Sequence, residues 1–542
     1  MSNITLFQAR KIITMDPNQP TATHVAVKDG RILAVGGADC ADFWGGGKLD
    51  KTLADTVLMP GFVEGHAHLM AGAIWRYTYT GFYDARDPKG KIWAGMKTID
   101  AVIASLKAAE AKLPEGEALC AWGFDPIFLP SERLNRKHLD QVSATRPILV
   151  LHSNGHLMTT NSKGLELAGY DRNTNVEGVA RFADGTPNGE LQEMAAMFPL
   201  SRRAKFDLRT IARTETALMD YGKLAQFVGV TTSADLVAEL PDDDLDQLLR
   251  VTKSAEFPIR LVPALSGITA PPEEIVARMP GLKKLSHDKL KIGMVKLMTD
   301  GSIQGYTSRM KWPGHVNGAP NGIWNAPPEV MAHMIEVIHA AGIQVHIHTN
   351  GDEASEVAIN GFQAAMRKYP NADHRHTLQH GQMINEAQFR RIKALGLGVN
   401  LFANHIWYFG DKHYEVTQGP DRAIRMDACR SALNHGVPLT IHSDAPVTPL
   451  NPLFTAWCAV NRVTPQGRVL GEYQRLTVSE ALHCITLGGA YSMHMDGDIG
   501  SIETGKRADF AVLGDDPLAV DPMSLKDVPV LGTVLGGQVQ LL

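Results

Sequence analysis

Short apolar runs alternate with helical stretches through the middle of this chain, and that alternation limits its fold more than any other sequence feature. Helices are predicted over residues 102–112 and 328–341, for example, between runs that have the continuous apolar character of buried parallel strands. The runs lie at residues 57–63, 147–151, 228–233, 259–263, 294–298, 344–347, 376–379, 397–401 and 438–441. Repeated strand–helix units, about eight in number, predict an α/β fold of the (β/α)8 TIM-type barrel class.

The two ends of the chain have a different pattern, because both consist of short strand-like segments and turns. Near the start, the turn Lys28-Asp29-Gly30 separates two such segments and indicates a hairpin. Chain termini often lie close together, so we predict a small β-sandwich from residues 1–57 and 491–542 beside a barrel over residues 58–490. The stretch from about 71 to 226 is long for one strand–helix step and is predicted to be an inserted subdomain over the barrel mouth.

Charge and cysteine content exclude several classes of protein. The 542 residues include 53 Lys and Arg against 58 Asp and Glu, and the net charge of -5 excludes a strongly basic nucleic-acid binder. The 5 cysteines lie far apart without a C-x-x-C pair, which fits a reducing compartment. The chain has neither a signal-peptide pattern nor an apolar run of roughly 18 residues, so we expect a cytoplasmic protein that contacts neither nucleic acid nor membrane.

Histidines follow the first apolar run of the predicted barrel. His66 and His68 stand two residues apart, so in an extended strand both imidazoles point to the same face. The catalytic residues of this barrel class lie at the carboxyl ends of its strands, where two such rings can bind one metal ion. The alternative is a pair of surface histidines in a loop.

Three further strand ends carry candidate ligands. One strand ends in His346 and His348, of which one would be a ligand and the other would line the site. Another ends in His380, although a lone histidine is more often a hydrogen-bonded core residue. A third is followed by Asp444, whose carboxylate can bind a metal and accept a proton, or can instead cap the following turn.

A lysine interrupts the apolar run 294–298. Burying the lone ammonium of Lys296 costs several kcal/mol or more unless it is paired or neutralised. A buried lysine has a depressed pKa, and its neutral amine can add CO2 to become an anionic carbamate that bridges two metal ions. The alternatives are that Lys296 faces outward or pairs with Asp300.

These candidates together favour a metal site over core packing, because imidazole or carboxylate groups follow four predicted strands and a lysine lies in a fifth. The ligands offer nitrogen and oxygen without thiolate. Such a set suits one or two divalent ions, with Zn as the first expectation and Mn, Fe or Co as alternatives.

The same residues, in the same order, resemble the amidohydrolase superfamily, and the flanking segments resemble its YtcJ-like branch (amidohydrolase family 3) over nearly the whole chain. The matching segments are MPGFVEGHAH at 59–68, His156 with Asn161-Ser162, GELQE at 189–193, KLMTDGS at 296–302, HTNGDEA at 348–354, SDAP at 443–446 and GSIETGKRAD at 500–509. The resemblance implies a metal-dependent barrel with a β-sandwich built from both termini.

The resemblance also implies a role for each matched residue. His66 and His68, with Asp444, would hold the more buried metal, and His348 and His380 the second. Lys296, carbamylated by CO2, would bridge them. A metal-bound hydroxide would attack an amide-type carbonyl, and Asp444 would pass its proton to the leaving nitrogen.

Substrate contacts are the part that the motifs define least. The branch often has arginine where this chain has Tyr306, and Arg309 is the nearest replacement. His156, from the insertion, is expected either to reach the site or to bond locally. His405 and Trp407 follow the run 397–401, and the aromatic residues there suggest an aromatic or apolar small-molecule substrate.

The first hypothesis is therefore a hydrolase of an N-acyl, N-formyl or cyclic amide that acts on non-peptide C–N bonds. The same metal site could instead hydrolyse an ester or lactone, and a non-catalytic regulatory relative is the third alternative, although such relatives lack part of the ligand set. A homodimer paired through an edge of the small sheet is left open.

Overall fold

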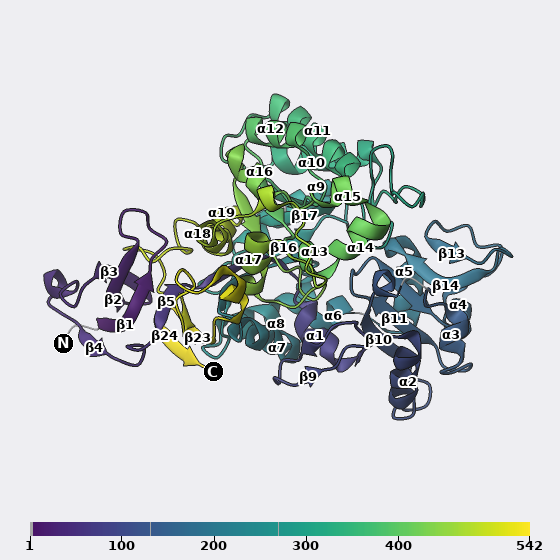
Figure 1. Cartoon of the computed structure of the whole chain (residues 1–542), viewed down its shortest axis with the longest axis horizontal. Coiled ribbons are helices and arrows are strands. Elements are labelled where there is room, and N and C mark those ends of the chain that lie inside the picture. The colour runs from purple at the N-terminus through teal and green to yellow at the C-terminus, as the bar shows by residue number, and fades with distance from the viewer. Residues whose placement is uncertain (1–3, 130–131, 207, 269) are drawn as a thin grey trace.

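A closed barrel of eight parallel strands forms the centre of the molecule in the computed structural model, which describes residues 4–129, 132–206, 208–268 and 270–542 (Figure 1). Its strands, in the order in which they neighbour one another, are β6 (Phe62–Ala67), β15 (Val230–Ala238), β16 (Arg260–Ser266), β17 (Met294–Met298), β18 (Gln344–Thr349), β19 (Thr377–His380), β20 (Gly398–Leu401) and β21 (Leu439–Ile441). The ring closes beyond β21, where Ala445 pairs in parallel with Ala67 of β6. The predicted barrel is confirmed.

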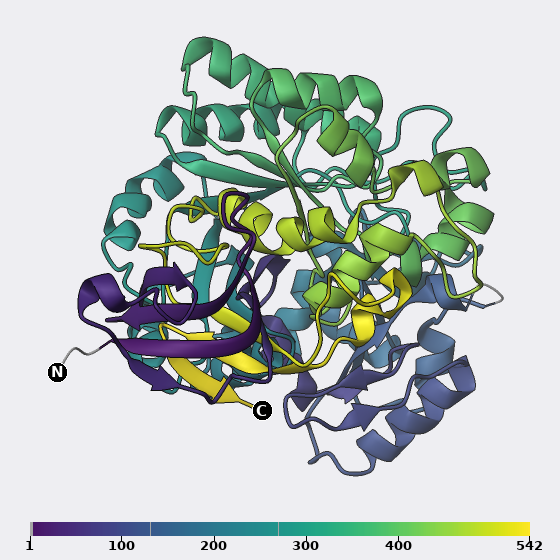
Figure 2. The same cartoon turned by 60° about the vertical axis from the view of Figure 1, so that its left-hand side comes forward.

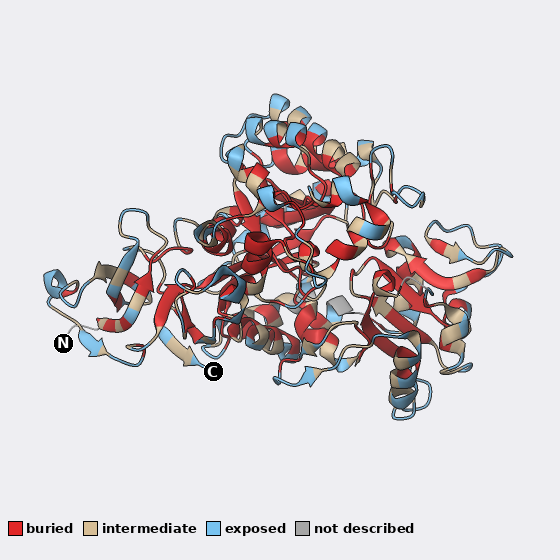
Figure 3. Ribbon diagram, in the orientation of Figure 1, coloured by how far each residue is buried: buried red, intermediate tan, exposed pale blue. Residues whose placement is uncertain are grey.

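Helices cover the outer face of the barrel, and side chains of the strands fill its inside, so β17 is buried along its whole length (Figure 3). They begin where the sequence supplies capping groups. Asn385 and Gln388 form a reciprocal capping box at α12, and Pro328 occupies the first turn of α10. The helices between and after the barrel strands are α7 (Glu215–Gln226), α8 (Asp242–Lys253), α9 (Pro272–Lys283), α10 (Pro328–Ala340), α11 (Asp352–Lys368), α12 (Glu386–Ala394), α13 (His405–Tyr408), α14 (Gly410–Lys412), α15 (Pro420–Ala423), α16 (Cys429–Asn434), α17 (Pro452–Asn461), α18 (Val478–His483) and α19 (Gly489–Ser492). Of the helices in the described ranges, none is long and apolar enough to cross a bilayer.

The segment between β6 and β15 builds a subdomain with its own sheet, seen at the right of Figure 1. The run at residues 147–151 corresponds to a strand of this sheet rather than of the barrel. The sheet order is β13 (Val179–Arg181), β14 (Pro187–Gln192), β12 (Leu157–Thr160), β11 (Ile148–His152), β10 (Leu119–Phe124) and β7 (Thr78–Tyr79). A separate hairpin pairs β8 (Ala85–Arg86) with β9 (Ile92–Trp93), and the helices are α1 (Met70–Ala73), α2 (Ile99–Glu110), α3 (Arg136–Asp140), α4 (Ser162–Ala168), α5 (Glu193–Arg203) and α6 (Leu208–Ala212).

The two ends of the chain share one eight-stranded sheet, in which purple and yellow strands lie side by side in Figure 2. This sheet is continuous and curls over one apolar core. Backbone hydrogen bonds also join the two ends of the chain. The Gly30 carbonyl accepts one from Ala508 N–H (2.9 Å), and the Ala508 carbonyl accepts one from Gly537 N–H (2.8 Å). The strand order is β24 (Gln538–Leu541), β23 (Val530–Leu535), β22 (Phe510–Leu513), β5 (Val57–Pro60), β1 (Thr5–Ile13), β2 (Thr21–Lys28) and β3 (Arg31–Gly36), with β4 (Lys48–Asp50) paired to β1.

The predicted boundaries of the barrel are shifted at both ends. The run 57–63 is two strands, and β5 belongs to the terminal sheet because it pairs with β1 and β22. The chain changes sheets at Gly61, where a Cβ would lie 2.0 Å from Thr231 Oγ1, so only glycine fits. At the other end, Met493, Met495 and Ile499 pack with apolar side chains of β6, β15, β16 and β17, so these residues belong with the barrel.

A buried ion pair joins the barrel to the terminal sheet. Arg260 of β16 donates from Nε to Asp509 Oδ2 (2.7 Å) and from Nη2 to Asp509 Oδ1 (2.9 Å), and both side chains are buried. Asp288 also accepts from Arg260. We expect Asp509→Ala to lower the free energy of unfolding by about 3 kcal/mol. This value is at the lower end of the range for breaking a buried ion pair, because Asp288 remains as a partner for Arg260.

Chemical denaturation followed by circular dichroism measures this change. Glu215→Ala is the control, because its partner Arg250 and Glu215 itself are both more than half exposed and the denaturation midpoint should stay unchanged. Equal midpoints for Asp509→Ala and the wild type would show that the ion pair does not hold the two units together.

Candidate metal centre

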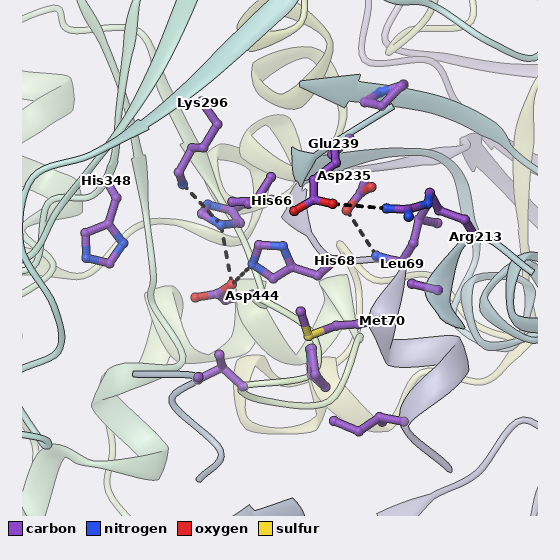
Figure 4. Close-up of a pocket in the computed structure, with 18 of the residues that line it drawn as sticks. His66, His68, Leu69, Met70, Arg213, Asp235, Glu239, Lys296, His348 and Asp444 are labelled. Atoms are coloured by element: carbon purple, nitrogen blue, oxygen red, sulfur yellow. Dashed lines mark hydrogen bonds and ion pairs between the residues drawn. The ribbon is translucent and has the colours of Figure 1, made fainter. Parts of the chain in front are cut away.

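The predicted ligands converge at the carboxyl ends of the barrel strands, where they line a cavity of about 150 Å³ (Figure 4). They come from the ends of five different strands, so only barrel closure brings them together. They are His66 in β6, His68 just after it, Lys296 in β17, His348 in β18, His380 at the end of β19 and Asp444 after β21.

His66, His68 and Asp444 form the tightest cluster. Asp444 Oδ1 lies 3.4 Å from His66 Nε2 and 3.2 Å from His68 Nε2, and the ligand atoms of all three residues lie within 4.8 Å of one another. Asp444 Oδ1 is nevertheless a buried atom without a hydrogen-bond partner among the described residues. A buried carboxylate oxygen needs a partner, and a cation among these three groups provides one, so the residues fit a metal ion.

Lys296 points into the cavity and not outward. Its side chain is 2% exposed, and Nζ lies 3.4 Å from His66 Nε2. Asp300, the alternative partner, instead accepts backbone N–H groups from Arg309, Asn350 and Gly351. Burial lowers the pKa of Lys296 to about 7, so a neutral amine is accessible near neutral pH.

His348 and His380 extend the cluster. Their ring centroids are 4.4 Å apart, and the His380 ring lies 4.7 Å from that of His66. His346 faces elsewhere, because its Nε2 contacts the Ser492 carbonyl at 3.0 Å and its Nδ1 contacts Gln379 Nε2 at 2.6 Å. Of the two histidines at the end of β18, only His348 lines the cavity.

A buried amide network orients the rings. Gln379 Oε1 accepts from His66 Nδ1 (2.7 Å), which leaves the lone pair on His66 Nε2 facing the cluster. Asn400 donates to the same Gln379 oxygen (2.9 Å) and accepts from His442 Nδ1 (2.9 Å). His442 Nε2 in turn lies 3.1 Å from His380 Nδ1. These side chains therefore set which nitrogen of each ring faces the cavity.

The electrostatics of the site suit metal ligands. Burial lowers the pKa values of His66, His348 and His380 well below 6.5, so these rings are neutral and keep a lone pair. Burial alone would raise the pKa of Asp444, but the neighbouring His66 and His68 outweigh it and hold that pKa well below its ordinary value. His66, His348 and His380 thus present neutral imidazoles near the carboxylate of Asp444.

Of the residues predicted to bind substrate, His156 reaches the cavity. It lies between β11 and β12 of the inserted subdomain, its ring is 5.2 Å from that of His348, and its Nδ1 contacts the Glu193 carboxylate at 2.9 Å. Glu193 has a positive φ of 59°, an uncommon conformation for a residue other than glycine. The insertion therefore supplies part of the wall opposite the strand ends.

The other four predicted substrate residues lie outside the described walls of this cavity, because each is held by neighbours elsewhere. Arg309 pairs with Glu353 and lies over the Trp324 ring. The Tyr306 hydroxyl accepts from Asn317, His405 pairs with the buried Asp427, and Trp407 packs against Tyr83. None of these four side chains therefore lines the metal cavity, and their contact with the substrate stays a prediction.

Sequence reasoning missed several wall residues. Asp235 lines the cavity from the end of β15 and accepts from Leu69 N–H (3.1 Å). It follows a predicted strand just as Asp444 does, so the same rule could have found it. The pair Arg213 and Glu239 also lines the cavity (Figure 4), but nothing in the surrounding sequence indicates it.

The fold and the donor set together define a metal-binding β/α barrel. The model of the Amidohydrolase family matches residues 53–540, which is most of the chain. The protein therefore belongs to the amidohydrolase family, as its motifs predict.

Similar proteins span nearly the whole chain. YtcJ of Bacillus subtilis (strain 168) is 26% identical over 97% of each chain, and N-substituted formamide deformylase of Arthrobacter pascens is 26% identical over 97% of this chain and 96% of its own. The crystal structure of an uncharacterized metal-dependent hydrolase from Pyrococcus horikoshii OT3 has a TM-score of 0.72 at 21% identity and covers 96% of this chain and 99% of that chain. The first two confirm the predicted branch, and the third confirms the barrel.

The amide network generates a prediction about metal affinity. Gln379→Leu should weaken metal binding about 10–100-fold, because His66 Nδ1 loses the acceptor that orients its ring. Chelator competition followed by elemental mass spectrometry measures the affinity. Gln382→Leu is the matched control, since this buried glutamine contacts Met426 Sδ at 3.7 Å and none of the predicted ligands. Equal affinities for the two variants would contradict the orienting role.

Proposed function

We propose that this protein is a metal-dependent hydrolase that cleaves an amide-type C–N bond in an N-acyl, N-formyl or cyclic amide. The observation that carries the proposal is the cluster of His66, His68 and Asp444, whose donor atoms face one another in a cavity at the barrel mouth. The similarity to a formamide deformylase over nearly the whole chain supports the choice of bond.

The ligand set divides into two groups. His66, His68 and Asp444 would hold one divalent ion, His348 and His380 a second, and Lys296 would link the two as its carbamate. Nitrogen and oxygen donors favour Zn, with Mn, Fe or Co as alternatives. Bound there, the metal polarises a carbonyl oxygen and lowers the pKa of a water molecule to about 7.

The carboxylate of Asp444 has the position and charge of a general base. It lies among the predicted ligands, and the neighbouring His66 and His68 keep it ionised. Asp444 accepts the proton of the attacking water and delivers it to the nitrogen that leaves as the C–N bond breaks. A protonated nitrogen departs as a neutral amine, which removes the high-energy amide anion from the path.

The Lys296 amine reacts with CO2 to form a carbamate and release one proton. This reaction converts a neutral buried amine into an anion, and two bound metal ions would balance its charge. Its support is the position of Nζ, buried in the cavity wall at 3.4 Å from His66 Nε2.

One prediction of this proposal concerns Asp444, the proposed proton carrier. Asp444→Asn should lower kcat/KM for N-formyl or N-acyl compounds about 10²–10⁴-fold, because the amide cannot accept the proton. Asp427→Asn is the control, a buried aspartate that pairs with His405 outside the cavity walls. Circular dichroism and metal content are measured on both. Unchanged turnover in folded Asp444→Asn would contradict the assigned base.

The second prediction concerns the bridge. Wild-type protein prepared without chelator should contain about two metal equivalents by elemental mass spectrometry and a carbamate signal after exposure to ¹³CO2. Lys296→Ala should lose metal and activity, and a short carboxylate such as acetate should restore part of both. Lys291→Ala is the control, because that ammonium binds the carbonyls of Met493 and His494. Full metal content and activity in Lys296→Ala would contradict the bridge while leaving the proposed metal-dependent hydrolysis intact.

A further inference from the structure

A second cavity, of about 450 Å³, adjoins the metal cavity and is hereafter called the aromatic chamber. The two cavities share four wall residues: Trp122, Ser153, Pro446 and Val447. Pro446 and Val447 directly follow Asp444 and Ala445, so the junction lies beside the predicted proton carrier. Well-packed interiors leave few voids larger than a water molecule, whereas small-molecule sites span about 300–1,000 Å³.

Aromatic rings supply much of the chamber wall, and they come from distant parts of the chain. Phe128 stacks against Phe82 with ring centroids 4.9 Å apart and against Phe409 at 5.5 Å. Tyr83 contacts Phe128 at 5.2 Å and Tyr408 at 5.0 Å. The inserted subdomain and the segment after β20 thus build one apolar wall. Ring faces and edges prefer other aromatic rings, so this wall favours a planar aromatic guest over an aliphatic one.

One polar group in this wall lacks a partner. Trp122 Nε1 is buried and has no hydrogen-bond partner within the described part of the chain, and the residue is 5% exposed. The tyrosine hydroxyls differ, because Tyr79 donates to the Tyr83 carbonyl (2.5 Å) and Tyr83 donates to that of Tyr408 (3.4 Å). Trp122 lines both cavities, so the residue that carries this unpaired donor stands in the wall between them.

We propose that the aromatic chamber is a specificity subsite that binds an aryl group of the substrate, with a hydrogen-bond acceptor on that group paired to Trp122 Nε1. The inference rests on the proposed amide hydrolysis, because the scissile bond would lie in the metal cavity while the aryl group occupies the chamber. Trp122 and Phe128 are then specificity-determining residues.

The test compares matched substrates. One is N-formyl-2-(4-methoxyphenyl)ethylamine, whose ether oxygen is the acceptor, the second is its unsubstituted phenyl analogue, and the third is N-formylhexylamine. We expect wild-type kcat/KM to be about tenfold higher for the two aryl compounds than for the alkyl compound. Equal values for aryl and alkyl substrates would overturn the proposal.

Two variants distinguish the contribution of the aromatic wall to kcat/KM from that of the hydrogen bond. Phe128→Ala should lower kcat/KM about tenfold for both aryl compounds and less than twofold for the alkyl one. Trp122→Phe, which keeps a ring but removes the N–H, should lower kcat/KM about three- to tenfold more for the methoxy substrate than for the other two. Phe206→Leu is the control, since Phe206 is a buried ring of the inserted subdomain that contacts Tyr77 and is not among the described lining residues of either cavity. A uniform loss on all three substrates in folded variants would overturn the specificity role.

A binding measurement separates failure of the subsite from failure of the reaction. Isothermal titration of metal-free protein with 4′-methoxyacetophenone, which contains no hydrolysable bond, should show binding that Phe128→Ala weakens about tenfold. Cyclohexyl methyl ketone should bind at least tenfold more weakly than the aryl ketone. Aryl-ketone binding without turnover of any amide would support the subsite and contradict the proposed reaction. Absence of aryl-ketone binding would overturn the subsite whatever the turnover.

Discussion

The seam between the first and last barrel strands is the constraint on which the site depends. Ala445 pairs with Ala67 across this seam, Asp444 N–H donates to the His66 carbonyl (3.1 Å), and His68 N–H donates to the Ala445 carbonyl (2.9 Å). Because these backbone bonds lock the two segments in register, the side chains of His66, His68 and Asp444 meet at one point. Asp444 has a positive φ of 54°, an uncommon conformation at the last position needed to complete the cluster.

The polar groups brought together at this seam can be buried only because neighbouring polar side chains form hydrogen bonds with them. Glu64 accepts from the Ser443 hydroxyl (2.8 Å) across the same seam, and burial raises the pKa of Glu64 to about 8. Gln379 and Asn400 serve the imidazoles in the same way. The buried Asp444 Oδ1 is the exception, which is why it indicates a cation more strongly than the histidines do.

The inserted subdomain has a functional position. It contributes His156 to the metal cavity, Phe128 to the aromatic chamber and Trp122 to the junction between them. The barrel ring supplies the predicted metal ligands, and the insertion, lying beside the barrel mouth, supplies walls that can discriminate between substrates. Under the proposed function, chemistry and specificity would reside on different parts of one chain, as in other barrels whose active-site loops vary around fixed strand ends.

The sequence by itself determined the barrel and the candidate ligands. Apolar runs ending in His66, His348, His380 and Asp444 reveal buried strands with polar ends, and a lysine inside such a run is too costly to bury without a role. These inferences depend on local periodicity and on the energy of burying charge, both of which are readable along the chain.

Only the tertiary structure decided which side chains line the metal cavity. Tyr306, Arg309 and His405 were expected near the substrate, but each is directed by a partner far away in sequence or by loop packing. Gln379, His442 and Asp235 went unassigned, because a side chain's partners depend on contacts between strands that sequence spacing does not specify. The split of the run 57–63 at Gly61 has the same origin, since the close approach of Thr231 exists only in the folded protein.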